Sequence, residues 1–343
     1  MLNDRGKEVQ DLREAMQPQV EGSAGDQQPG ATLSVILVSF NTRELTLSCL
    51  GHLYSLELPS RTEVWLVDNG SQDNSAHHVR EAFPNVSLIC NEQNLGFSRA
   101  VNMALKRCSG RFALLLNTDC FPEPSAVAEL LRVMESRPSV GIAAGSLLHS
   151  NGRPQNSFGR APTLGTELLP KALLEVLLPS RFPSKRRPPS VPMEVESVVG
   201  AFLMVRRKAW EEVGLLDEGY FFFLEETDWC VRMRKGRWSV LHVPQARAVH
   251  LQGGSAAAQG AAARIEFYRS RYRFFRLHRG ELAAATLKGG LILKGFCNLV
   301  FSGLMGVLPL PWTSKWRDRN RIHREILIWH LKGCPQGWGL ERG

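Results

Sequence analysis

The sequence lacks the short motifs by which several large enzyme classes bind phosphate or build a nucleophile. It has no GxGxxG segment after its first predicted strand, and no GxxxxGK[ST] or GxSxG segment anywhere in its 343 residues. The first two absences argue against a dinucleotide-dependent dehydrogenase and a P-loop nucleotide hydrolase. The third argues against a serine hydrolase with a nucleophile elbow. A functional site in this chain must therefore be built from carboxylates and amides.

Paired cysteines are also missing. The seven cysteines are scattered, with no CxxC pair and no spacing typical of metal ligands. Isolated cysteines in a chain of this length predict buried thiols in a reducing compartment rather than a disulfide framework. Residues 1–30 are polar and rich in glutamine, unlike a secretory signal, so we expect a disordered N-terminal tail and a cytoplasmic protein.

The chain has an excess of positive charge, with a formal net charge of +9. Much of this excess lies in residues 181–190 and in two aromatic segments, 264–280 and 314–325. Such clusters are typical of surfaces that contact nucleic acid, phosphate groups or anionic membranes. Because no nucleic-acid-binding signature accompanies them, we predict that nucleic acid is not a partner.

Short apolar segments alternate with helical segments in the first part of the chain. LSVILVSF, EVWLVDNG, VSLICN and RFALLLNTD are each followed by a segment with helical spacing. This alternation predicts an α/β fold with a mostly parallel central sheet flanked by helices. In such sheets ligands bind beyond the carboxyl ends of the strands. Polar residues follow all four predicted strands, at 39–41, 68–71, 91–96 and 117–119.

Two aspartates end predicted strands, and each allows two interpretations. Asp68 could accept a hydrogen bond from a nucleobase or a ribose, or it could cap the next helix through the turn chemistry of Asn69-Gly70-Ser71. Asp119 could hold a metal ion, or it could be part of a solvated strand end. Neither aspartate decides between its alternatives when it is taken alone.

A second acidic cluster lies in the segment YFFFLEETDWCVRM, where Glu225, Glu226 and Asp228 directly follow aromatic and apolar residues. Carboxylates packed against aromatic rings are desolvated, which raises their pKa and makes them better bases. In a helix Glu225 and Asp228 share a face, while Glu226 points elsewhere. The alternative is an acidic helix N-terminus that is stabilised by the helix dipole. His250 ends a strand-like segment and is either structural or a second metal ligand beside an aspartate.

The last part of the chain combines basic and apolar segments. Residues 295–312 form an uninterrupted apolar stretch, slightly shorter than the about 20 residues that a spanning helix needs. A spanning helix, an interfacial anchor and a helix packed on the first domain all remain open. Because basic aromatic segments flank the stretch, we expect attachment to an anionic membrane surface. We predict a domain over residues 31–260, with a variable loop at 160–192, and a helical, membrane-associating region over residues 261–343.

Six motifs occur in an order that resembles glycosyltransferase family 2, and they cover residues 33 to about 255. They are VSFN, VDNGSQDNS, NEQNLGFSRAVNMAL, LLLNTDC, VVGAFLMVRRKAWEEVGLLDEGYFFFLEETDWCVRMRKG and VPQARAVH. The subgroup that the chain resembles most is that of the bacterial rhamnosyltransferases that use dTDP-rhamnose. The resemblance implies a GT-A fold and an inverting, metal-dependent transfer of a sugar from a nucleotide-diphosphate donor. The acceptor would be a lipid-linked or cell-surface glycan at the inner face of the cell membrane.

The resemblance also implies roles for individual residues. Ser39, Asn41 and Asp68 would hold the nucleoside. The region of the diphosphate and the sugar would be lined by Asn94, Gly96 and Asn102. Asn117 occupies the first acidic position of a DxD-type metal site, which leaves Asp119 as the main anionic ligand of Mg²⁺ or Mn²⁺, with His250 and the diphosphate as further ligands. Glu226 occupies the position of the catalytic base, with Glu225 as the alternative base and Asp228 as a further acid. Because Asn117 and Glu226 depart from the usual residues, a non-catalytic nucleotide-sugar-binding scaffold in a glycan assembly complex is the alternative function.

Overall fold

The computed structural model describes residues 32–170, 190–251, 260–307 and 313–340. The predicted tail over residues 1–30 and the larger part of the predicted loop over 160–192 lie outside these residues. Within the loop, the structure describes a short helix, α6 (Leu164–Leu168). Its first turn is capped by Thr163, which accepts a hydrogen bond from the backbone N–H of Thr166.

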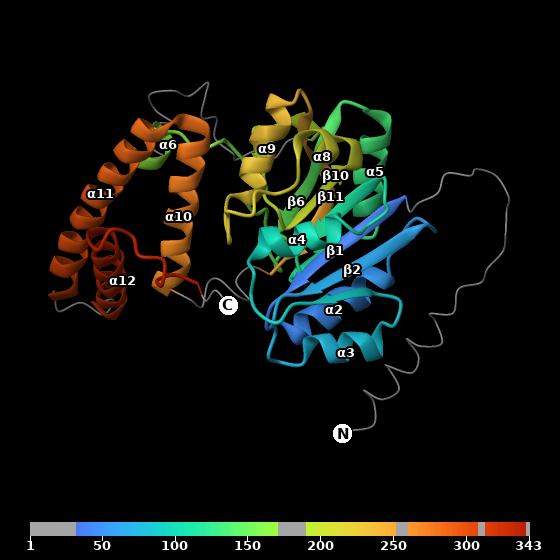
Figure 1. Cartoon of the computed structure of the whole chain (residues 1–343), viewed down its shortest axis with the longest axis horizontal. Helices are drawn as coiled ribbons and strands as arrows, with labels where there is room; N and C mark the ends of the chain where they lie inside the picture. Colours follow the sequence, from blue (N-terminus) through green and yellow to red (C-terminus); the bar gives the residue numbers. More distant parts are fainter. Residues whose placement is uncertain (1–31, 171–189, 252–259, 308–312, 341–343) are drawn as a thin grey trace. The chain divides into compact units, whose positions relative to one another are not determined.

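Four parallel strands form one half of the central sheet (Figure 1). They are β1 (Leu33–Ser39), β2 (Thr62–Asp68), β3 (Ser87–Cys90) and β4 (Phe112–Leu116), and they lie in the order β3-β2-β1-β4. The four strands predicted from the apolar segments are confirmed. Their carboxyl ends lie at the same edge of the sheet because all four run in one direction.

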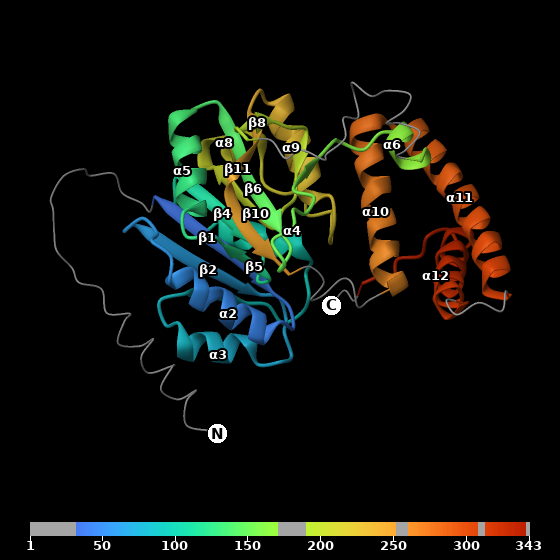
Figure 2. The ribbon, with the colours of Figure 1, turned by 180° about the vertical axis from the view of Figure 1, so that it is seen from behind.

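The other half of the sheet is mixed. It continues beyond β4 with β10 (Phe202–Arg206), β6 (Val140–Leu148), β11 (Ser239–His250) and β5 (Cys120–Pro122), in that order (Figure 2). β10 is antiparallel to both of its neighbours, β11 is parallel to β6, and β5 is antiparallel to β11. β8 (Met193–Glu194) adds to β11, and a separate pair is formed by β7 (Phe158–Gly159) and β9 (Ser197–Val198).

Helices cover both faces of the sheet and bury alternate strand residues. On β1, Leu33, Val35 and Leu37 belong to the core that contains α2 (Arg43–Tyr54) and α5 (Ala126–Ser136). Ile36 belongs to the core on the other face. That face is covered by α4 (Phe97–Leu105), α8 (Arg207–Val213) and α9 (Glu225–Lys235), while α3 (Ser75–Ala82) packs beside α2. Burial on both faces explains why the strands read as continuous apolar segments.

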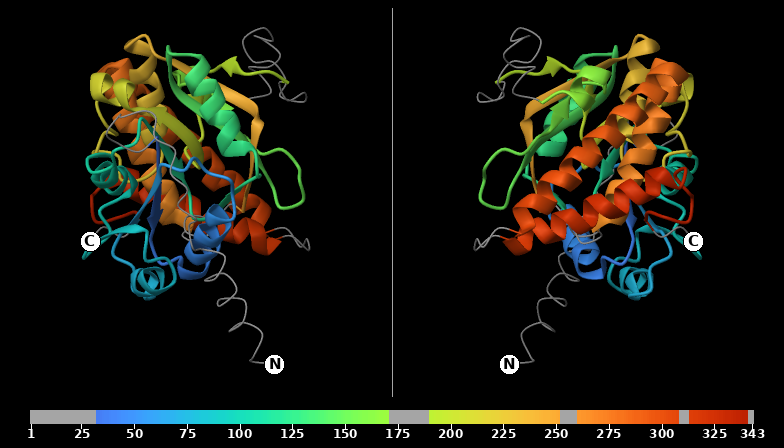
Figure 3. Two further views of the ribbon diagram at one scale, coloured as in Figure 1. Left: turned by 90° about the vertical axis from the view of Figure 1, so that its right-hand side faces the viewer. Right: turned by 90° about the vertical axis from the view of Figure 1, so that its left-hand side faces the viewer.

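Three helices follow the sheet: α10 (Gly260–Arg279), α11 (Glu281–Val307) and α12 (Thr313–Leu331) (Figure 3). They share a third core with Phe274, Phe275 and Trp329 at its centre. Among the described residues, one helix segment, Glu281–Met305, is long and apolar enough to cross a membrane, judged by length and composition alone, and its mean hydropathy is 1.2.

Helix α10 is bonded to the segment that leads into α9. Arg273 forms two hydrogen bonds of 2.9 and 2.7 Å with Asp217, and the hydroxyl of Ser270 donates to the carbonyl of Phe222 at 2.8 Å. Residues 31–343 form one compact unit. α10 thus packs on the segment before α9, and within the described residues the structure shows no boundary between units near residue 260. That residues 261–343 associate with a membrane stays a prediction.

The cysteines are free thiols in the described structure, as the absence of paired spacing predicted. Cys49, Cys108, Cys120 and Cys230 are buried. The expectation that all of them are buried is wrong for Cys90 and Cys297, which are exposed.

Asp228 is buried and forms an ion pair inside the protein, so it does not face a site that is open to a ligand. Its two carboxylate oxygens lie 2.7 Å from Nε of Arg232 and 2.7 Å from Nε2 of His278, which belongs to α10. Nδ1 of His278 lies 3.2 Å from the ammonium group of Lys235, so Nδ1 accepts and Nε2 donates to Asp228. Both oxygens are thus occupied, and we do not keep Asp228 among the candidate catalytic acids.

The first prediction concerns this ion pair. We expect Asp228→Ala to lower the free energy of unfolding by about 3–5 kcal/mol, because it leaves Arg232 and His278 without their buried partner. Urea denaturation followed by circular dichroism measures the change. Glu135→Ala is the matched control, since Glu135 pairs with Arg111 at the same 2.7 Å but both side chains are about half exposed. We expect it to cost less than about 1 kcal/mol, and equal losses would contradict the interpretation.

Candidate active site

The loops that follow the parallel strands are joined by backbone hydrogen bonds at the carboxyl edge of the sheet. The N–H of Asn69 donates to the carbonyl of Ser39, and the N–H of Asn91 donates to the carbonyl of Asp68, both at 2.8 Å. On the other side of the sheet centre, the N–H of Asn117 donates to the carbonyl of Ala201 at 3.0 Å. The polar segments singled out in the sequence therefore meet at one edge.

Asn41 and Asp68 are brought together around Ser71. The backbone N–H of Asn41 donates to the Ser71 hydroxyl at 2.9 Å, and that hydroxyl donates to the carboxylate of Asp68. Asp68 is buried, and this burial raises its pKa. Asp68 also accepts from the backbone N–H of Ser71, so the turn that the alternative named is present. Asp68 does not cap α3, because Asp73 accepts from the N–H of Ser75, the first residue of that helix, at 3.0 Å.

Ser39 and Asn102 use their side chains within the protein. The hydroxyl of Ser39 is fully buried and lies 2.9 Å from the hydroxyl of Thr46. The Asn102 amide donates to the carbonyl of Leu216 at 2.9 Å and to Glu218 at 3.1 Å, and its oxygen accepts from the N–H of Leu216. The predicted contacts of Ser39 and Asn102 with a nucleotide sugar would have to replace these bonds, so we keep neither residue in the proposed site.

Asn94 and Gly96 shape the loop between β3 and α4. The Asn94 side-chain oxygen accepts from the amide of Asn69 at 2.8 Å and from the N–H of Gly96 at 3.0 Å. Gly96 has φ of 86°, and a Cβ atom there would lie 2.7 Å from the carbonyl oxygen of Phe221. The next N–H, that of Phe97, donates to this same carbonyl. Glycine is therefore required for the β3–α4 loop to approach the aromatic segment before Glu225.

Asp119 and His250 are adjacent in the structure. β5 pairs with β11 so that Cys120 lies opposite His250, and the N–H of Leu251 donates to the carbonyl of Asp119 at 2.9 Å. As a result, Nε2 of His250 lies 3.3 Å from Oδ1 of Asp119. The two residues are separated by about 130 positions in the chain, and the structure places together the two side chains that the resemblance had named as ligands of one ion.

Gln155 orients the His250 ring, and the sequence analysis missed it. Its amide nitrogen donates to the carbonyl of Leu148 at 3.1 Å and to the carbonyl of His250. Its oxygen therefore faces Nδ1 of His250, 3.2 Å away, and accepts the Nδ1 proton. Nε2 is then the ring nitrogen that faces the Asp119 carboxylate. Gln155 follows the hairpin turn after β6, and no local pattern links it to a histidine 95 residues later.

The Asp119 and His250 pair fits a divalent cation in its donor chemistry. A carboxylate oxygen and a histidine nitrogen are both lone-pair donors, and at 3.3 Å they are spaced like neighbouring ligands of one ion. Among the described residues, no cluster of three or more His, Cys, Asp or Glu side chains could hold a metal. A cation at this pair would therefore need further oxygen ligands, which for Mg²⁺ commonly come from substrate phosphates and water.

Glu225 and Glu226 begin α9 but differ in environment. They follow two residues with left-handed backbone, Phe223 with φ of 70° and Leu224 with φ of 66°. Glu225 is buried, and its Oε2 atom has no hydrogen-bond partner among the described residues. Burial and the neighbouring Glu226 raise the pKa of Glu225 well above its ordinary value, which favours its protonated form.

Glu226 is the carboxylate that remains partly exposed. Desolvation raises its pKa to about 7. Its side chain lies against Gly200, where a Cβ atom would be 3.4 Å from the Cβ of Glu226 and 3.9 Å from its carboxyl carbon. Gly200 precedes Ala201, whose carbonyl binds Asn117. The Gly200–Ala201 turn therefore links Glu226 to the strand end that carries Asn117 and Asp119, and Glu226 is better placed than Glu225 to act as a base.

Comparison with known proteins gives the context of this site. Residues 34–214 match the family model described as glycosyl transferase family 2. Over 260 residues the chain is 27% identical to an N-acetylglucosaminyl-diphospho-decaprenol L-rhamnosyltransferase of Mycobacterium tuberculosis, an alignment that covers 70% of this chain and 84% of the relative.

Two solved structures are similar in fold. The mannosyltransferase PcManGT from Pyrobaculum calidifontis, in complex with GDP-Man and Mn²⁺, has a TM-score of 0.51 at 14% identity, with 94% of both chains covered. GalNAc-T7 with UDP, GalNAc and Mn²⁺ has a TM-score of 0.54 at 14% identity, covering 89% of this chain and 57% of that chain. These likenesses support the GT-A fold predicted from the sequence.

The second prediction tests the close approach at Gly96. We expect Gly96→Ala to lower the free energy of unfolding by about 1–3 kcal/mol more than Gly152→Ala, because both glycines have positive φ but only Gly96 contacts Phe221. At Gly152 an added Cβ atom meets nothing within 4 Å. Thermal or urea denaturation of both variants measures the difference. Equal destabilisation would show that backbone strain alone decides the effect.

Proposed function

Because the chain belongs to glycosyl transferase family 2, we propose that it is an inverting, metal-dependent glycosyltransferase. It would move a sugar from a nucleotide-diphosphate donor to a hydroxyl group of a lipid-linked or cell-surface glycan acceptor. The observation that carries the proposal is Glu226, a carboxylate with a pKa near 7 beside the turn that binds Asn117. A catalytic base works best when its pKa is close to the operating pH.

Glu226 would remove the proton of the acceptor hydroxyl. A hydroxyl group is a weak nucleophile at neutral pH and needs a positioned base as it attacks. A single attack from the side opposite the leaving diphosphate inverts the configuration at the anomeric carbon. Glu225 would stay protonated and neutral, which keeps a second negative charge away from Glu226 and holds the pKa of Glu226 near neutrality.

Asp119 and His250 would hold Mg²⁺ or Mn²⁺. When bound, such an ion supplies positive charge that stabilises the leaving diphosphate. Gln155 would orient the His250 ring by accepting the Nδ1 proton, so that Nε2 is the nitrogen that faces the ion. The Mn²⁺ in the complexes of the two similar solved structures supports this proposal.

The remaining site residues would bind the donor. Asn41 and Asp68, which meet at Ser71, would contact the nucleoside, while Asn94, Gly96 and Asn117 would border the diphosphate and the sugar. The name of the mycobacterial relative supports rhamnose as the sugar and a polyprenyl diphosphate as the carrier of the acceptor. We therefore propose dTDP-rhamnose as the donor.

The α11–α12 region would attach the protein to the inner, anionic face of the cell membrane. α11 exposes large apolar side chains, among them Leu293, Phe296 and Leu304. α12 exposes arginines, including Arg317 and Arg324. Apolar side chains beside arginines are typical of helices that lie at a membrane surface.

The third prediction tests the base. We expect Glu226→Gln to lower the rate of sugar transfer about 10²–10⁴-fold, because an amide cannot accept the acceptor proton. Glu225→Gln should leave the rate nearly unchanged, since glutamine resembles a neutral carboxyl group. Release of the nucleoside diphosphate measures both variants, and circular dichroism checks that both are folded. Equal losses would assign the base to the pair rather than to Glu226.

The pH profile gives an independent test of the same residue. The carboxylate form of Glu226 is the active one, so the rate should rise about tenfold between pH 6 and pH 8 and then level off. A profile that is flat across this range would contradict Glu226 as the base. Nucleotide binding without nucleotide release with any acceptor would favour the non-catalytic scaffold.

The fourth prediction tests the cation and the donor. We expect dTDP-rhamnose with Mn²⁺ to raise the thermal midpoint of unfolding more than UDP- or GDP-sugars do, and EDTA to abolish the Mn²⁺-dependent part. Asp119→Ala should remove that part, and Gln155→Leu should weaken Mn²⁺ binding about 10–100-fold because the His250 ring loses its orienting partner. An unchanged Mn²⁺ response in both variants would rule out this pair as the metal site.

A further inference from the structure

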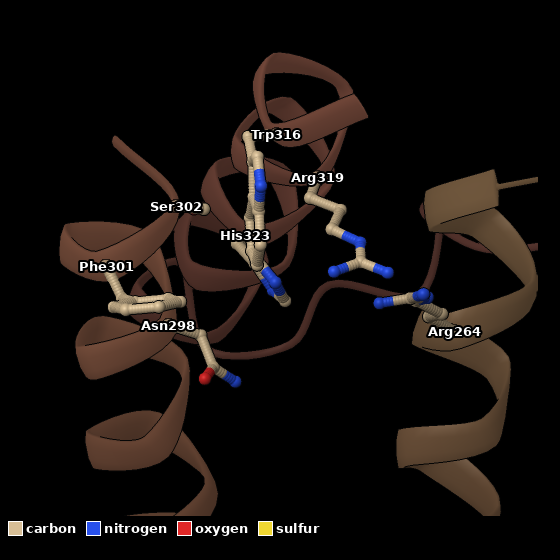
Figure 4. A pocket seen from close by; sticks show the side chains of 7 residues that line it. All are labelled: Arg264, Asn298, Phe301, Ser302, Trp316, Arg319 and His323. Carbon is tan, nitrogen blue, oxygen red and sulfur yellow. The ribbon is translucent and has the colours of Figure 1, made fainter. Parts of the chain in front are cut away.

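A pocket with a volume of about 330 Å³ lies among the three C-terminal helices (Figure 4). It is lined by one residue of α10, three residues of α11 and three residues of α12: Arg264, Asn298, Phe301, Ser302, Trp316, Arg319 and His323. Behind it, the amide of Asn320 donates to the carbonyl of Leu299 at 2.9 Å and to the hydroxyl of Ser302 at 3.2 Å. The wall formed by α11 and α12 is therefore held by bonds that do not involve the charged lining residues.

The pocket is positively charged. Figure 4 shows the guanidinium groups of Arg264 and Arg319 directed toward each other from facing helices. None of the seven lining residues is acidic, and among the described residues neither arginine forms an ion pair. Burial together with the charges of Arg264 and Arg319 lowers the pKa of His323, so His323 is neutral at pH 7 and can still donate one hydrogen bond.

Aromatic side chains hold the arginine of α12 in place. The guanidinium of Arg319 lies 4.8 Å above the ring of Trp316, which meets the ring of Phe301 edge to face at 5.4 Å. A stacked guanidinium loses little freedom when it binds, and its planar fork matches the oxygens of a phosphate group. Two converging guanidinium groups with amide and imidazole neighbours match the donors that a phosphate group needs.

The pocket adjoins an exposed apolar stripe. Leu293, Phe296, Val300 and Leu304 are all exposed and lie on one face of α11 at helical spacing. Phe301, which lines the pocket, is itself more than half exposed beside this stripe. A free phosphate would use only the pocket, whereas an amphiphile with a phosphate head and acyl chains would use both features.

We propose that this pocket binds the phosphate of an anionic membrane phospholipid while the stripe on α11 contacts its acyl chains. The inference deepens the proposed membrane attachment by naming the residues that recognise the head group, and it does not depend on which sugar is transferred. Arg264 and Arg319 contact the phosphate oxygens, and Asn298 and His323 surround them with hydrogen-bonding groups.

Vesicle sedimentation with the full-length protein tests the proposal. The vesicles are phosphatidylcholine alone or an equimolar mixture of phosphatidylcholine and phosphatidylglycerol. The pocket variant is Arg264→Gln with Arg319→Gln. The matched control is Arg317→Gln with Arg324→Gln, which removes the same charge from exposed positions on α12 outside the pocket.

We expect the pocket variant to bind the mixed vesicles at least about tenfold more weakly than the control variant does. Diffuse attraction to the anionic surface would weaken both variants equally, and that result would overturn the proposal. The proposal would also be overturned if the unaltered protein bound only to phosphatidylcholine vesicles that contain a polyprenyl diphosphate. The same holds if inorganic phosphate failed to displace the unaltered protein and both variants from the mixed vesicles. Sugar transfer to a soluble acceptor, measured in parallel, shows separately whether the proposed enzymatic function holds.

Discussion

The antiparallel pairing of β5 with β11 is the contact on which the candidate site depends. β5 is only three residues long, and it follows β4 at the centre of the sheet after the turn that carries Asn117 and Asp119. By pairing with the end of β11, it brings Asp119 beside His250. Because β11 also pairs in parallel with β6, the hairpin after β6 can place Gln155 against the same histidine. The two pairings of β11 therefore bring together the two possible cation ligands and the residue that orients one of them.

Burial has opposite consequences for the three acids at the start of α9. Asp228 is buried between the Arg232 guanidinium and the Nε2–H of His278, so both of its oxygens have partners inside the protein. Glu225 is buried without such partners, and burial raises its pKa well above the ordinary value. Glu226 is partly exposed and lies against Gly200, and its pKa of about 7 allows it to ionise near neutral pH. Position on the helix alone would not separate these roles, because Glu225 and Asp228 share a face and still differ in their hydrogen-bond partners.

The sequence predicted the features that depend on neighbouring residues. The four parallel strands could be predicted because burial on both faces requires continuous apolar segments. The polar ends of these strands followed from the same pattern. The antiparallel direction of β10 could not be predicted, since an apolar strand of five residues carries no sign of its direction. The internal bonds of Ser39 and Asn102 were missed for another reason, because the partners of Asn102 lie more than 110 residues away and Ser39 is buried by the fold itself.

Helix α10 contacts both the positively charged pocket and the residues at the start of α9. Near its start, Arg264 lines the positively charged pocket, and one turn later Phe267 packs on Phe223, two residues before Glu225. Near its end, His278 binds Asp228 in α9. A helix is stiff over its length, so a force on one turn is passed to the next. A lipid phosphate held at Arg264 would therefore act on the helix that fixes the start of α9, where the proposed base lies. The pocket, the contact of Phe267 with Phe223 and the bond of His278 to Asp228 thus all lie on α10, so the proposed lipid site and the start of α9 share one supporting helix.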